Sequence, residues 1–172
     1  ILLDLVRPDE GEATVLGFDC QKDSLKVRGM IGALLEKPVF PSNVTAIRLL
    51  RFVGRAKGLS DIQALDETGK LLKWVGLEPF MEKEIEFYSA GMRQRLGLAQ
   101  ALMGKPDLVL LDEFTANLDP LARARILSEI RRICEEYDVS FFISSHILPE
   151  LEQVCDQIGI LHRGALVAEG DM

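Results

Sequence analysis

Two mostly apolar runs separated by one amphipathic segment constrain the fold of this chain more than any other feature. The runs cover residues 108–111 and 139–143. Runs of this kind are typical of strands that a parallel sheet buries on both faces. Between them, apolar residues recur at helical spacing: Ile126, Ile130, Ile133, Cys134 and Tyr137. Since a strand–helix–strand unit is nearly always parallel and right-handed, the sequence predicts an α/β fold with a mostly parallel sheet.

Polar side chains follow both predicted strands. Asp112 and Glu113 come directly after the first strand, and His146 lies just beyond the second. The carboxyl ends of parallel strands meet at one edge of a sheet, where ligands of open α/β folds bind. An adjacent carboxylate pair can hold Mg²⁺ and orient or deprotonate a water, while a histidine can donate to a phosphate. The sequence therefore predicts a site for phosphoryl transfer to water at this edge.

Several flanking elements are also predicted. Apolar positions after Ser89 recur at helical spacing and predict a helix, whose first N–H groups favour an anion. Two further helices are expected over residues 45–57 and 61–75, and residues 1–6 are expected to be the tail of another helix. Short strands are expected at residues 12–16 and 30–35, and a hairpin is expected around residues 163–164.

Composition excludes several function classes. Apolar residues make up 48% and charged residues 27% of the chain, as in ordinary globular proteins. The longest stretch without Asp, Glu, Lys or Arg is residues 139–149, shorter than the roughly 20 apolar residues of a membrane-spanning helix. A net charge of -7 argues against nucleic acid as a partner. The cysteines Cys20, Cys134 and Cys155 lack metal-ligand spacing, so reduced thiols are expected.

Four motifs in a fixed order give the chain a family resemblance. They are YSAGMRQRL at residues 88–96, LVLLDE at 108–113, ANLDP at 116–120 and SSH at 144–146. Over nearly its whole length the chain resembles the ATP-binding subunit of an ABC transporter. The resemblance implies a P-loop NTPase-like ABC ATPase domain, with an α/β core over residues 1–41 and 88–172. Residues 42–87 correspond to the family's helical subdomain, which meets the membrane subunit.

The resemblance also implies a role for individual residues. Asp112 would be the Walker B aspartate that holds Mg²⁺ through water, Glu113 the general base, and His146 the switch histidine near the γ-phosphate. Asp119 would belong to the D-loop, which crosses the dimer interface. The signature motif, which contacts ATP held by a second ATPase subunit, would be Tyr88, Ser89, Ala90, Gly91 and Met92.

The cofactors and partners implied by the resemblance are ATP, Mg²⁺, a second ATPase subunit and a transmembrane permease. The protein would then be cytoplasmic and peripheral on the inner face of the cell membrane. Residues 31–46 resemble the same stretch in subunits of export systems, which favours an exporter. The transported substrate is not specified by the sequence.

Three residues depart from the family pattern. Glu36 stands where the Q-loop usually has Gln; its carboxylate could still meet Mg²⁺, but it adds negative charge beside the triphosphate. Met92 replaces the usual polar end of the signature motif. Phe114 replaces the Pro that is common after the Walker B Glu.

A phosphate-binding P-loop is missing from these 172 residues. The motif reads G-x-x-x-x-G-K-[ST]. Gly-Lys pairs occur at residues 69–70 and 104–105, but Leu71 or Pro106 follows where Ser or Thr is required. In the family, the P-loop precedes the helix that residues 1–6 are expected to end. We therefore expect an N-terminally truncated domain that binds ATP poorly and does not turn it over alone.

Further functions are compatible with parts of the pattern. Ser89, Asp112 or Asp119, and His146 occur in the chain order of an α/β-hydrolase triad, but Phe87 occupies the position of the first glycine of the nucleophile elbow. A serine hydrolase is therefore disfavoured. The motifs are also compatible with an ABC-type ATPase that acts on ribosomes rather than in transport, and with a non-enzymatic dimerisation or regulatory module.

Overall fold

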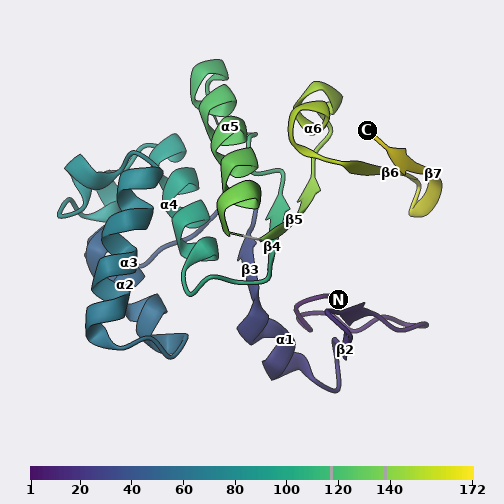
Figure 1. The fold of residues 1–172 in the computed structure, drawn as a ribbon, viewed down its shortest axis with the longest axis horizontal. Helices are drawn as coiled ribbons and strands as arrows, with labels where there is room; N and C mark the ends of the chain where they lie inside the picture. Colours follow the sequence, from purple (N-terminus) through teal and green to yellow (C-terminus); the bar gives the residue numbers. More distant parts are fainter. Residues whose placement is uncertain (117, 138) are drawn as a thin grey trace.

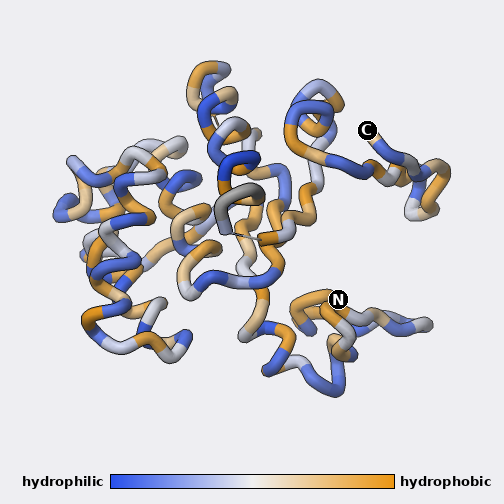
Figure 2. Tube along the Cα trace, viewed as in Figure 1, coloured by the Kyte–Doolittle hydropathy of each residue, from blue (hydrophilic) through white to orange (hydrophobic). Residues whose placement is uncertain are grey.

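A three-stranded parallel sheet forms the centre of the computed structural model, which describes residues 1–116, 118–137 and 139–172 (Figure 1). Its strands are β3 (Ile31–Leu34), β4 (Leu108–Asp112) and β5 (Ser140–Ser144), in the order β3-β4-β5. The predicted parallel pairing of the second and third strands is confirmed. Figure 2 shows apolar residues concentrated along these strands.

The crossover between β4 and β5 is the helix α5 (Pro120–Tyr137), as the sequence predicts. Its apolar face packs on β4 and on the helix α4 (Ala90–Leu102). The buried members of this cluster are Leu34, Leu98, Ala101, Leu102, Val109, Leu111, Phe114, Leu118, Ile126, Leu127, Ile130, Ile133 and Val139. Burial of these side chains supplies the main hydrophobic stabilisation of the sheet.

Two glycines allow α4 to lie very close to β3. A Cβ atom on Gly32 would come within 1.8 Å of the carbonyl oxygen of Ala101 in α4. A Cβ atom on Gly97 of α4 would lie 2.5 Å from Cδ1 of Leu34 in β3. At Gly32 any side chain would overlap the backbone of α4, while at Gly97 a side chain would require Leu34 to shift, so Gly32 in particular sets the distance between the helix and the sheet.

A second cluster joins α4 to two further helices, α2 (Ala46–Ala56) and α3 (Asp61–Trp74). Thr45 caps α2, and Ser60 forms a capping box with Gln63 at the start of α3. These helices confirm the two predicted at residues 45–57 and 61–75. Two short 3₁₀ helices, η1 (Glu78–Phe80) and η2 (Ile85–Phe87), lead from α3 to α4.

The remaining elements flank the sheet in sequence. On the N-terminal side are β1 (Thr14–Val15), β2 (Phe18–Asp19) and α1 (Ser24–Met30). On the C-terminal side are α6 (Leu148–Val154), β6 (Gln157–His162) and β7 (Ala165–Asp171). The hairpin of β6 and β7 turns at Arg163 and Gly164, as predicted, and both residues have positive φ.

Two sequence predictions are wrong. Residues 1–6 form turns and bends rather than a helix, and Asp4 has a φ of 54°, which no right-handed helix contains. Leu2 and Leu3 pack instead beside a small cluster that includes Val27, and so short a segment has little intrinsic helical stability. The strand β5 is not buried on both faces, because the Phe142 side chain is 62% exposed.

In the described part of the chain, no helix combines the length and the hydropathy that crossing a bilayer would require.

Candidate active site at the carboxyl ends of the strands

The register of β4 and β5 places Asp112 directly beside Ser144. The Ser144 hydroxyl donates a hydrogen bond to Oδ1 of Asp112, at 2.6 Å. The N–H of Glu113 donates to the Ser144 carbonyl oxygen (3.1 Å) and to its hydroxyl oxygen (3.2 Å). Ser144 thus fixes the backbone of Glu113 and the side chain of Asp112.

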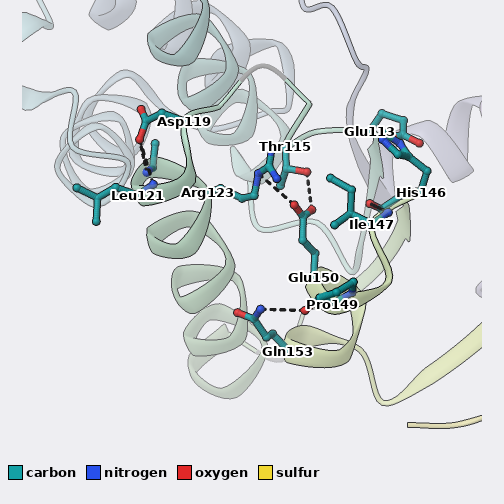
Figure 3. A network of polar contacts seen from close by, with 12 residues as sticks. Glu113, Thr115, Asp119, Leu121, Arg123, His146, Ile147, Pro149, Glu150 and Gln153 are labelled. Carbon is teal, nitrogen blue, oxygen red and sulfur yellow. Dashed lines mark hydrogen bonds and ion pairs between the residues drawn. The ribbon is translucent and has the colours of Figure 1, made fainter.

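Glu113 and His146 meet beyond the ends of these two strands. Nδ1 of His146 lies 2.8 Å from Oε2 of Glu113, in a contact that is an ion pair when the imidazole is protonated (Figure 3). The Glu113 side chain is 29% exposed and the His146 side chain 72%, so both are accessible to a ligand. The structure therefore brings together the carboxylate and imidazole that the sequence placed at one sheet edge.

The backbone of Glu113 is strained. Its φ is 45°, in the left-handed region that residues other than glycine seldom adopt. The two hydrogen bonds from its N–H to Ser144 hold this conformation. Such strain occurs preferentially at functional sites, where the surrounding structure maintains it.

Asp119 begins the helix α5. Its Oδ1 accepts hydrogen bonds from the N–H groups of Leu121 (3.1 Å) and Ala122 (2.9 Å). Figure 3 shows the Asp119 carboxylate beside the first turn of the helix, on the side of α5 away from Glu113. Asp119 is exposed, so it can meet a neighbouring molecule while it caps its own helix.

The predicted signature motif forms the N-terminus of α4. Ser89 is the N-cap, and its hydroxyl oxygen accepts a hydrogen bond from the N–H of Met92 at 3.2 Å. Ser89 and Ala90 are exposed, and Gly91 and Met92 are half-buried. The first N–H groups of this 13-residue helix form an electropositive end.

Tyr88 differs from the rest of the motif because its side chain points into the protein. The ring is buried, and its hydroxyl donates a hydrogen bond to the carbonyl oxygen of Phe80 at 2.7 Å. Burial raises the pKa of Tyr88 above its usual value of 10.0. The Tyr88 side chain therefore anchors the segment that leads into α4.

Glu36 lies at the same edge of the sheet as Asp112. Leu34 pairs with Leu111, and Glu36 follows two residues later. Its carboxylate forms an ion pair with Lys37 at 3.6 Å. Among the described residues, no three His, Cys, Asp or Glu side chains gather as a metal-binding group. Carboxylates such as those of Asp112 and Glu36 are the side chains that proteins use for Mg²⁺, which is often held through one or two carboxylates while water and phosphate supply the other ligands.

The sequence reasoning missed a buried polar network beside the site. Glu150 is only 4% exposed, and its Oε2 accepts a hydrogen bond from the Thr115 hydroxyl at 2.6 Å. Nε of Arg123 lies 3.1 Å from Oε1 of the same carboxylate. One signal was present in the sequence: Glu150 shares a helical face with Ile147 and Val154, and a charge on an apolar face implies buried partners.

The groups required by a serine hydrolase are engaged elsewhere. The imidazole of His146 contacts Glu113, and the hydroxyl of Ser89 caps α4. In the described ranges, no hydrogen bond joins Ser89 to His146, so the nucleophile–base pair of a triad is not formed.

Comparisons with known proteins agree with the motif order. A family model described as ABC transporter matches residues 1–116. The bacitracin transport ATP-binding protein BcrA of Bacillus licheniformis is 37% identical over 169 residues, which are 98% of this chain and 54% of that protein. The linearmycin resistance ATP-binding protein LnrL of Bacillus subtilis is 34% identical over 166 residues, 96% of this chain and 53% of that protein.

A solved structure, described as that of an ATP binding subunit of an ABC transporter, has the same fold. It superposes with a TM-score of 0.88 at 27% sequence identity, over 99% of this chain and 71% of that one. The chain spans about half the length of the curated relatives that it matches.

Proposed function

Because the chain belongs to the ABC transporter family and has its P-loop NTPase-like ATPase fold, we propose that the protein hydrolyses ATP to power a membrane exporter. The observation that carries the proposal is the contact of Glu113 with His146 beside Asp112, at the carboxyl ends of two parallel strands. A carboxylate pair next to an imidazole supplies the metal ligand, the base and the hydrogen-bond donor that phosphoryl transfer to water requires.

The residues at this edge divide the chemistry between them. Asp112 would be the principal residue that holds Mg²⁺, with Glu36 as a second candidate; when bound, the ion would neutralise charge on the phosphate oxygens. Glu113 accepts the proton of the attacking water. His146, in its protonated form, donates through Nδ1 to Glu113 and through Nε2 to the γ-phosphate.

A second ATPase subunit completes the proposed site. Ser89 and Gly91, at the electropositive start of α4, contact the γ-phosphate of ATP held by that subunit, and Ala90 and Met92 complete this surface. Tyr88 contributes by anchoring the motif from inside. Asp119 meets the second subunit at the start of α5.

The partner in the membrane is a permease, which the protein meets from the inner face of the cell membrane. In this proposal residues 42–87 form the helical subdomain that docks on the permease, and residues 1–41 and 88–172 form the catalytic core. Relatives named for bacitracin transport and linearmycin resistance favour an export system. The acidic net charge of -7 disfavours nucleic acid as the partner.

The 172-residue chain by itself is a poor ATPase in this proposal. It contains no G-x-x-x-x-G-K-[ST] segment, whose backbone N–H groups and lysine cradle phosphates. We therefore expect weak ATP binding and slow turnover by the isolated chain.

The test uses the full-length protein reconstituted with its permease in lipid vesicles. Wild type hydrolyses ATP, while Glu113→Gln binds ATP and loses hydrolysis by a factor of about 10² to 10⁴, because the amide cannot accept a proton. Glu152→Gln, at an exposed glutamate outside both the sheet edge and residues 42–87, is the matched control and keeps wild-type turnover. Near-normal hydrolysis by Glu113→Gln would refute the assignment of the base. Copurification with ribosomes in place of a permease would favour a ribosomal ATPase.

A further inference from the structure

Three chain segments that carry the candidate site converge on one buried carboxylate, that of Glu150. The Thr115 hydroxyl donates to its Oε2 at 2.6 Å, and Nε of Arg123 lies 3.1 Å from its Oε1. Figure 3 shows both side chains directed at the two carboxylate oxygens, Thr115 from the loop after β4 and Arg123 from α5. Glu150 itself belongs to α6.

Each member of this network is close in sequence to a residue of the candidate site. Thr115 follows Glu113 by two residues. Arg123 follows Asp119 by four, and its backbone N–H donates to the Asp119 carbonyl oxygen at 2.9 Å. Glu150 follows His146 by four. If any one of these three segments moved relative to the other two, the site residue next to it, Glu113, Asp119 or His146, would be displaced.

The two contacts of the carboxylate differ in kind. Among the described residues, neither Arg123 Nε nor Glu150 Oε1 makes a hydrogen bond, so their 3.1 Å contact is an ion pair without hydrogen-bond geometry. The Thr115 hydroxyl makes the short, directional contact. Arg123 compensates the buried charge, while Thr115 sets the relative position of the β4 loop and α6.

We propose that Glu150 is a positioning residue, which holds the loop of Glu113, the start of α5 at Asp119 and the loop of His146 in one geometry. The inference rests on the proposed function, because the geometry it maintains is that of the hydrolytic site. Glu150 acts through Thr115 and Arg123 and touches none of the reacting groups. Removing the Glu150 carboxylate lowers the rate of the chemical step more than it weakens ATP binding, because the chemical step depends more strongly on the exact positions of the reacting groups.

The experiment compares variants of the full-length protein reconstituted with its permease. Glu150→Gln and Thr115→Val lower kcat by about 10- to 100-fold with KM for ATP nearly unchanged. Thr115→Ser retains the hydroxyl and keeps kcat near that of wild type. Glu152→Gln, an exposed glutamate on the same helix, is the matched control and has no effect. Wild-type kcat in Thr115→Val, or an equal loss in Thr115→Ser, would overturn the proposal.

A second readout does not depend on hydrolysis. Hydrogen exchange at the backbone amides of Glu113 and Arg123, both hydrogen-bonded in this structure, is faster in Glu150→Gln than in wild type or Glu152→Gln. The amides of α2 are unchanged. If wild type shows no ATPase activity, the proposed function fails, and exchange alone decides the positioning role. Unchanged exchange at both amides would then overturn it.

Discussion

Nδ1 of His146 and Oε2 of Glu113 lie 2.8 Å apart, although 32 residues separate them in the chain. The contact exists because both residues lie just beyond adjacent parallel strands whose register pairs Asp112 with Ser144. It commits one imidazole nitrogen to the carboxylate and leaves the other for a ligand.

This contact predicts that Glu113 and His146 act as a unit. His146→Ala is expected to lower the ATPase rate of the reconstituted protein by a factor of about 10² or more. The double variant Glu113→Gln/His146→Ala is expected to be no slower than the worse single variant, since groups that act together are non-additive. Rates that multiply in the double variant would show that the residues act independently.

Ser144 is predicted to control the use of magnesium. Ser144→Ala removes the hydroxyl that donates to Asp112 at 2.6 Å, so the carboxylate loses its orientation. The Mg²⁺ concentration that gives half-maximal ATPase activity is expected to rise about tenfold. Ser140→Ala, at the exposed opposite end of β5, is the control. An unchanged magnesium requirement in Ser144→Ala would contradict the prediction.

Gly91 is predicted to be needed for nucleotide rather than for folding. A Cβ atom there would lie 3.5 Å from Leu118 Cδ2, an ordinary contact, so Gly91→Ala fits the structure. Its thermal stability is expected to equal or exceed that of wild type, by up to about 1 kcal/mol of helix propensity. ATPase activity is nevertheless expected to fall, because the methyl group obstructs the approach of phosphate to the helix start.

Gly97→Ala, in the same helix, is expected to have the opposite effect on stability. Its Cβ atom would lie 2.5 Å from Leu34, so this variant is expected to lose stability, measured by chemical denaturation. If Gly91→Ala were destabilised to the same extent, or kept full ATPase activity, the nucleotide contact would be rejected.

Tyr88 is predicted to make stability depend on alkaline pH. Burial raises its pKa above 10.0, so the folded protein favours the protonated phenol. The resulting stability is fully present below about pH 10 and is lost as the pH rises through the folded-state pKa. Tyr88→Phe lacks the hydrogen bond to Phe80 and is expected to be about 1 kcal/mol less stable at neutral pH.

The difference between wild type and Tyr88→Phe should shrink above pH 10, because only wild type loses the phenol proton. Urea unfolding of both proteins across this range measures the difference directly. A difference that stays constant with pH would show that Tyr88 ionises equally in the folded and unfolded chain.

Sequence patterns predicted the helices in which an apolar repeat extends over many residues or a recognisable N-cap residue marks the start. The helix after Ser89 and the helix after Ser60 begin where their caps predict. The parallel pairing followed from strand–helix–strand order alone. The helix predicted for residues 1–6 does not form, because their conformation depends on how Leu2 and Leu3 pack, which no local pattern encodes.

The candidate site was predictable only in part. Adjacent carboxylates after an apolar run indicated Asp112 and Glu113, but the Ser144 hydrogen bonds depend on the register of two strands. Thr115 and Glu150 are 35 positions apart in the chain, and they meet only because α6 packs beside α5 and close to the loop after β4. Contacts of this kind arise from tertiary structure and leave weak traces in a single sequence.

Gly32 in β3 and Gly97 in α4 let the strand and the helix pack unusually close together. Gly32 lies against the backbone of Ala101, and Gly97 lies against the side chain of Leu34, so the helix and the strand are packed with little space between them. We therefore expect β3 and α4 to move together as one packed unit, so that any rearrangement of the candidate site relative to α2 and α3 would change the connecting loops before this contact.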